Sequence, residues 1–174
     1  ILLSSGWQGD LAPRAGLETI AVPVARHADG SSITGPVLIR LMNLPAGSST
    51  TPLSSGYTDL RYQRPVTMDT SQALLTKQSS DDGQLVTVPP QDWAFANCEK
   101  APFPGEPDPT RVCLKGGFEP DLLYQLVFTA KDPLVLGIGL AATRDIVSFF
   151  QYGASVAGVA QNPIAGLVTH AIGA

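Results

Sequence analysis

One stretch of the chain, between Gly139 and Tyr152, has the apolar spacing of an amphipathic helix. Its apolar side chains recur at intervals of three and four residues, at Ala142, Ile146, Phe149 and Phe150. Gly153 follows, at a position where helices commonly end. Elsewhere the apolar runs are short, and 17 Gly and 15 Pro among the 174 residues interrupt them. The pattern predicts one substantial helix among short strands and plentiful loops.

Changes in this pattern divide the chain into three expected regions. Residues 1–18 are predicted to form a core strand followed by a loop that borders a cleft. Residues 19–117 contain strand patterns and turn formers but no convincing helix, which indicates a β-rich insertion. Residues 118–174 contain a strand pattern, the helix and a second apolar strand pattern. Because a helix, a short loop and an apolar strand make up a unit of a parallel sheet, we predict an α/β fold.

Alternating apolar residues locate the individual strands. A hairpin is expected over residues 19–42, with its turn at Ala28-Asp29-Gly30-Ser31. Further strands are predicted around residues 73–77, 84–88, 122–130 and 168–172. In the strand at 122–130, one face is expected to hold four large apolar or aromatic side chains, those of Leu122, Tyr124, Leu126 and Phe128.

The two cysteines, Cys98 and Cys113, bracket a stretch rich in Pro and Gly. Two buried free thiols are one interpretation, but we favour a disulfide, since such a loop has little else to hold it. A disulfide implies an oxidising compartment and hence a secreted or periplasmic protein. The two cysteines do not suffice for a structural zinc site, because His27 and His170 lie far away in the sequence.

Composition excludes several classes of function. The net charge of -4 leaves no basic patch, which argues against a nucleic-acid partner. No apolar run approaches the roughly 20 residues that a membrane span needs. No motif for a metal or an organic cofactor is visible, and none is expected.

Both ends of the chain lie in apolar, strand-like runs, beginning at Ile1 and ending near Ile172. Domain boundaries usually fall in polar, flexible segments, so we expect this chain to be a segment of a larger protein. Its partner would be the remainder of the same polypeptide or a complementary cleaved chain.

Five short motifs carry a resemblance to a known family. They are Gly-Trp-Gln-Gly-Asp at residues 6–10, DPLVLGIGLAATRD at 132–145, Ser-Phe-Phe at 148–150, Asn-Pro-Ile-Ala-Gly at 162–166 and His-Ala-Ile-Gly at 170–173. Together they resemble the bacterial "α/β hydrolase domain-containing" proteins, over essentially the whole chain. The resemblance implies a segment of an α/β-hydrolase-type sheet with a β-rich, disulfide-containing insertion.

The resemblance also implies a function. In that family, the strand matching residues 168–172 leads into a nucleophile elbow of the form G-x-S-x-S-G, whose Ser works with a His and an acid. The chain ends at Ala174, so these three residues would lie outside it and no catalytic residue is assigned within it. The expected function is the scaffold part of a secreted serine hydrolase that cleaves a small-molecule carboxylic ester through an acyl-enzyme. The alternative is a catalytically inactive, hydrolase-like binding or accessory chain.

Four residues are candidates for contact with the substrate, namely Trp7, Gln8, Gly9 and Asp10. They follow the first predicted strand, where loops of α/β proteins border the cleft. Trp7 could stack on a substrate, and Gln8 or the Gly9 amide could meet one of its polar groups. In the alternative interpretation, Trp7 packs under the insertion and Asp10 caps a turn.

Other notable residues are interpreted mainly as structural. Lys131 and Asp132 end a strand before Pro133, where Asp commonly fixes a turn. Arg144 and Asp145 lie on the helix and are assigned an architectural role. Two aromatic residues, Trp93 and Phe95, are expected to anchor the disulfide loop, although they could instead line a lid over the cleft.

Overall fold

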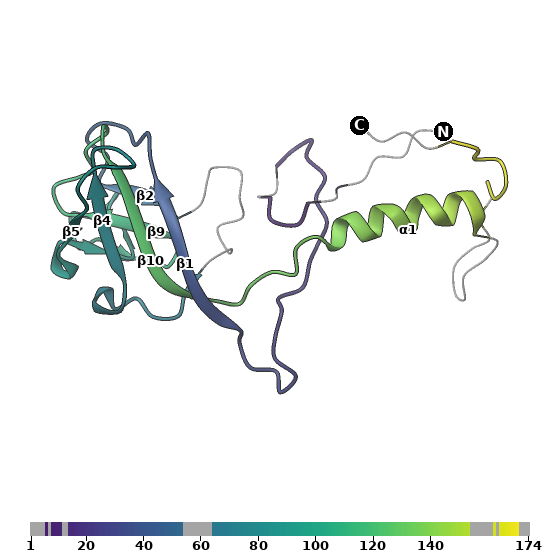
Figure 1. Ribbon diagram of the computed structural model, residues 1–174, viewed down its shortest axis with the longest axis horizontal. Coiled ribbons are helices and arrows are strands. Elements are labelled where there is room, and N and C mark those ends of the chain that lie inside the picture. Colours follow the sequence, from purple (N-terminus) through teal and green to yellow (C-terminus); the bar gives the residue numbers. More distant parts are fainter. Residues whose placement is uncertain are drawn as a thin grey trace. The chain divides into compact units, whose positions relative to one another are not determined.

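The computed structural model describes residues 6, 8–11, 14–53, 64–153, 162 and 164–170. Their backbone forms two compact units, which are described separately (Figure 1). The larger unit comprises Val24–Leu134 together with Asp10–Ala12, and it contains every strand that the structure describes. The smaller unit contains the described residues of Ile1–Gly9, Pro13–Pro23 and Val135–Ala174, including the helix.

The main sheet of the larger unit is organised around one long strand, β10 (Leu123–Lys131). On one side β10 pairs with β1 (Thr34–Leu41), and on the other it pairs with β4 (Leu74–Gln78) and then with β3 (Arg64–Pro65). The sheet continues from β4 to β5 (Val86–Val88), and every one of these pairings is antiparallel. Figure 1 shows β10 in green between β1 and β4.

The register of β10 explains the position of the core. Ile39 lies opposite Leu126, and Leu126 lies opposite Leu75, so three buried aliphatic side chains form one row across three strands. Tyr124 and Phe128, two residues away on either side, are buried on the same face. Burying a side chain of this size stabilises the fold by roughly 1.5–3 kcal/mol. The alternating pattern of residues 122–130 is therefore the main source of the core.

Shorter strands form a second layer. β9 (Arg111–Leu114) pairs with both β2 (Thr50–Pro52) and β6 (Trp93–Ala94), and β7 (Ala96–Asn97) pairs with β8 (Glu106–Pro107). Two 3-10 turns, Thr70–Gln72 and Pro90–Asp92, precede β4 and β6. The ring of Phe95 meets those of Trp93 and Phe128 edge-on, with centroids 5.2 and 5.6 Å apart, and so joins this layer to β10.

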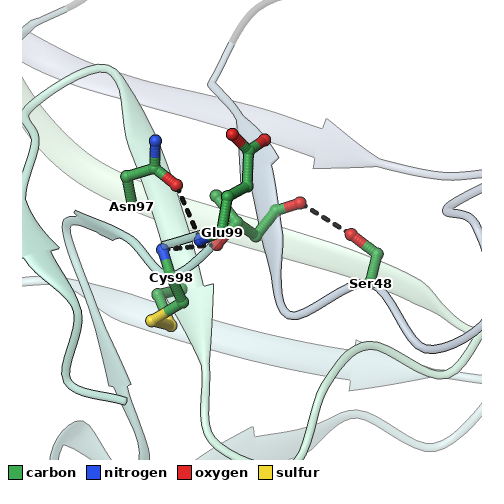
Figure 2. The surroundings of a disulfide bond; sticks show 6 residues. Ser48, Asn97, Cys98 and Glu99 are labelled. Atoms are coloured by element: carbon green, nitrogen blue, oxygen red, sulfur yellow. Dashed lines mark hydrogen bonds between the residues drawn. A yellow bond between two sulfur atoms is a disulfide. The ribbon is translucent and has the colours of Figure 1, made fainter. Parts of the chain in front are cut away.

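A disulfide between Cys98 and Cys113 holds this layer together, as the sequence predicted. Both cysteines are buried, and their Cα atoms lie 5.7 Å apart. The Cys98 amide donates to Thr50 Oγ1 at 2.7 Å, and Ser48 Oγ donates to the Thr50 carbonyl at 2.7 Å (Figure 2). The Glu99 amide donates to Asn97 Oδ1 at 2.9 Å in the same figure. The cross-link therefore lies within a hydrogen-bonded set of strands rather than in the open loop that was expected.

The smaller unit is built around α1 (Ile138–Tyr152), which confirms the predicted helix. Its last turn is closed by Gly153, whose amide donates to the Phe149 carbonyl at 2.8 Å. The buried Asn162 side chain adds donors to the carbonyls of Phe149, at 2.9 Å, and Gly153, at 3.0 Å. These contacts satisfy carbonyl groups that a helix end otherwise leaves unpaired. With 15 residues, α1 falls short of a membrane span, and no other described helix is long and apolar enough to form one.

The predicted α/β fold, a segment of an α/β-hydrolase-type sheet, is wrong. The described strands pair antiparallel, and the regular structure of the described residues is mostly β-sheet with one α-helix. The strand at 122–130 was expected to join a parallel sheet next to the helix, but it pairs with β1 and β4 instead. Residues 168–170 adopt no strand, and residues 171–172 lie outside the described part.

The predicted hairpin over residues 19–42 is also wrong, although its turn and its second strand are confirmed. Gly30 has φ +84°, and the Ser31 amide donates to Asp29 Oδ1 at 2.9 Å, as in a tight turn. β1 follows this turn but takes β10 as its partner, because β10 offers a longer apolar face than residues 19–25. The strands expected around 73–77 and 84–88 are confirmed as β4 and β5.

Removing the disulfide should destabilise the larger unit markedly. The cross-link closes a loop with a sequence separation of 15, for which the loss of unfolded-state entropy is worth about 3 kcal/mol. The double variant Cys98→Ala/Cys113→Ala should therefore lose roughly that much free energy of unfolding in urea titrations. A loss well below 1 kcal/mol would show that the strands hold this layer without the cross-link.

The larger unit should also fold by itself. Its entry and exit are adjacent, since Val24 forms an isolated bridge with Leu134 and the Ala25 amide donates to the Pro133 carbonyl at 2.8 Å. A fragment of residues 24–134 is expected to be monomeric and to unfold in one cooperative transition. A broad, non-cooperative transition, measured by circular dichroism with the disulfide intact, would contradict this.

Candidate functional site

The structure places two of the four predicted substrate-contact residues against a neighbouring segment. The Gln8 carbonyl accepts a hydrogen bond from the Ile20 amide at 3.3 Å. A Cβ added to Gly9 would lie 2.6 Å from Val22 Cγ1, so the glycine allows close approach of residues 20–22. These two contacts give Gln8 and Gly9 a structural role, which is to hold the neighbouring segment of residues 20–22.

Of the other two predicted residues, one lies in the larger unit and one lies outside the described residues. Asp10 is half-buried and belongs to the larger unit, whereas Gln8 and Gly9 belong to the smaller one. Trp7 lies outside the described residues. The proposed substrate contacts of Trp7, Gln8, Gly9 and Asp10 stay a prediction.

The structural interpretation of two other pairs is supported. Asp132 has φ +56° and accepts a hydrogen bond from Ser32 Oγ at 2.8 Å, so it fixes the chain where β10 ends. Trp93 and Phe95 are each 2% exposed and lie in the main core, as anchors rather than as a lid.

Arg144 and Asp145 form an ion pair at 2.6 Å on the exposed face of α1. The two histidines belong to different units, His27 to the larger and His170 to the smaller. His27 is exposed beside the turn, and His170 Nδ1 lies 3.0 Å from Thr169 Oγ1, the hydroxyl of its own neighbour. The His27 amide donates to the Ser31 carbonyl at 3.0 Å, which is a backbone contact within the turn.

A recess opens where the pairing along β10 is interrupted. β4 pairs with β10 as far as Val127, and β3 takes over at Ala130. Between them the chain leaves the sheet through the Thr70–Gln72 turn, although the Val66 amide still donates to the Thr129 carbonyl at 2.9 Å. The cavity has a volume of about 200 Å³ and is lined by Val66, Thr67, Asp69, Gln72, Ala73, Phe128 and Thr129.

Asp69 is the one carboxylate on the lining of this recess, and neutral groups hold it in place. Its Oδ1 accepts from the Ser71 amide at 3.0 Å and from Ser71 Oγ at 2.7 Å, and its Oδ2 accepts from Gln72 Nε2 at 3.2 Å. The hydrogen bonds from the Ser71 side chain, and then from its amide, lower the pKa of Asp69 below 3.8. The lining of the recess therefore combines apolar residues, Val66, Ala73 and Phe128, with hydroxyl groups and a fixed negative charge.

Sequence reasoning missed this recess. Its residues come from segments about 60 positions apart, and only the register of β3 and β4 on β10 brings them together. One local signal was available: Asp69-Thr70-Ser71 has the composition of a capped turn. That signal locates the turn but does not predict the cavity beside it.

Comparison with known proteins gave no match. No protein-family model, no curated protein and no solved structure is significantly similar to this chain. The family resemblance is therefore not supported by an independent match, and the function must be argued from the residues themselves.

Asp69 should matter for the stability of the turn in a pH-dependent way. Because its pKa is lower in the folded chain, its contribution is present above pH 3.8 and is lost as the pH falls further. Asp69→Ala should lower the melting temperature at pH 7, whereas Asp69→Asn should lower it less, since Asn also caps turns. Equal melting temperatures for both variants and the parent at pH 7 would contradict this role.

Proposed function

We propose that this chain is the non-catalytic part of a larger, secreted serine hydrolase that cleaves carboxylic esters. In this proposal the β-rich unit, Val24–Leu134, is an accessory module inserted into the hydrolase chain. The triad residues would lie outside the chain, and a small-molecule ester would be the substrate.

The observation that carries the proposal is the way in which the β-rich unit enters and leaves the chain. Val24 and Leu134 bridge each other, so the main segment of the unit, Val24–Leu134, begins and ends at one place. A module with adjacent ends can be inserted into another domain without separating the parts on either side. Its core and its disulfide both lie between these ends.

Two further features support the hydrolase assignment. The most specific of the resembling motifs, residues 132–145, runs from the end of β10 into α1, outside the strands of the inserted module. The Cys98–Cys113 disulfide fits an oxidising compartment and therefore secretion.

A second candidate is a binding module without hydrolase activity. It is favoured by the outer face of the main sheet, where Leu38, Val127 and Leu74 lie in one row across β1, β10 and β4. Leu38 is 54% exposed and Leu74 is 46% exposed. An exposed apolar row of this kind is typical of a surface that contacts another molecule.

Labelling with a fluorophosphonate probe distinguishes the two candidates, because the probe reacts with the activated serine of serine hydrolases. We expect the full-length protein to hydrolyse p-nitrophenyl esters and to carry the label on a serine outside residues 1–174. A label on a serine within this chain would contradict the non-catalytic assignment. The absence of both label and turnover would overturn the hydrolase function and favour the binding module.

A further inference from the structure

Most of the cationic side chains that the structure describes are neutralised by a carboxylate. Six of them form ion pairs with Asp or Glu, namely Arg26, Arg40, Lys77, Arg111, Lys115 and Arg144. Arg14 has an interaction of its own. Within the described part of the chain, Arg64, Lys100 and Lys131 form no ion pair.

Two of these three cations lie directly opposite each other on neighbouring strands. Arg64 on β3 is the register partner of Lys131 on β10, so both side chains leave the same face of the sheet. On the other side of Lys131, the register partner is Thr34 of β1, which adds an exposed hydroxyl to the same row. The nearest carboxylate in sequence, Asp132, is already engaged by Arg26 and Ser32. Like charges directly opposite each other destabilise a sheet, so this row is a favourable place for an anion.

The cationic row adjoins the recess. Thr129, two residues before Lys131 on β10, and Val66, two residues after Arg64, both line it, and the Val66 amide donates to the Thr129 carbonyl at 2.9 Å. Residues two apart on a strand share a face and lie about 7 Å from each other. An anion on the row would therefore be one short hydrocarbon length from Val66, an exposed apolar side chain on the lining of the recess.

We propose that Arg64 and Lys131 bind the carboxylate of a small organic acid, and that the recess takes its hydrocarbon part. The guanidinium of Arg64 can donate two parallel hydrogen bonds to a carboxylate, and Lys131 adds a second positive charge. The volume of about 200 Å³ fits one ring or a short acyl chain. Asp69 lines the same recess and disfavours a second negative charge, so the site should prefer monoanions with an uncharged tail. The proposal concerns binding alone and does not depend on hydrolase activity.

Nuclear magnetic resonance titration of the isotope-labelled chain tests this site, with benzoate as the probe. Benzoate should bind with a dissociation constant on the order of 1 mM and shift the amide signals of Val66 and Thr129. Arg64→Gln and Lys131→Gln should each weaken binding on the order of tenfold, because each removes a charge-assisted hydrogen bond. Lys100→Gln, which removes an exposed cation outside the row, is the matched control and should leave the affinity unchanged. Asp69→Asn should strengthen binding.

Two further probes separate charge from hydrocarbon. Benzyl alcohol has the ring without the charge, and inorganic phosphate has the charge without the ring; both should bind more weakly than benzoate. Raising the salt from about 0.01 M to about 1 M should weaken benzoate binding but not benzyl alcohol binding. Because this comparison uses the unsubstituted chain, it tests the role of charge even if a variant fails to fold. Equal affinity for phosphate and benzoate, loss of binding in Lys100→Gln, or no shift at Val66 and Thr129 would each overturn the proposal.

Discussion

The main sheet depends on the pairing of β10 with strands on both of its sides. On one side β10 pairs with all of β1, and on the other it pairs with β4 and then with β3. Because side chains alternate along a strand, this register places Tyr124, Leu126 and Phe128 together on the buried face. A slip of one residue would turn all three outward, so the same pairing that builds the core also fixes every neighbouring strand.

The same register explains why a proline is tolerated on β1, and where the recess and the pair Arg64 and Lys131 lie. The Asp132 amide donates to the Ile33 carbonyl at 3.2 Å, which marks Ile33 as a residue whose backbone N–H and C=O point toward β10. These groups alternate in direction along β1, so the backbone nitrogen of Pro36, three residues later, points away from β10. A proline, which has no N–H to donate, is tolerated on that side. On the opposite side of β10, the change from β4 to β3 leaves the recess, and it also aligns Arg64 with Lys131. The recess and the Arg64–Lys131 pair therefore both follow from the pairing of one side of β10 with two different strands, β4 and β3.

The sequence predicted local features better than their pairing. Alternating apolar residues predicted a strand at 122–130, and apolar spacing around Ile146 predicted a helix. The Pro/Gly-rich stretch between Cys98 and Cys113 predicted a disulfide, and all three features are present. The pairing was wrong because alternation identifies a strand but not its partner. The helix and the apolar run at 168–172 were taken as a parallel unit, whereas β10 pairs antiparallel with residues 45 to 97 positions earlier. The recess and the cationic row depend on that long-range pairing, so no local pattern could predict them.

Native-state hydrogen exchange tests most directly whether β10 is the strand on which the unit depends. The amides of Gln125, Leu126 and Val127 lie where β10 is flanked by both β1 and β4. They should exchange only through global unfolding and should be the most slowly exchanging amides of Val24–Leu134. The amides of β5, at one end of the sheet, should exchange through smaller openings. Exchange of the three β10 amides at the same rate as those of β5, or faster, would contradict this account.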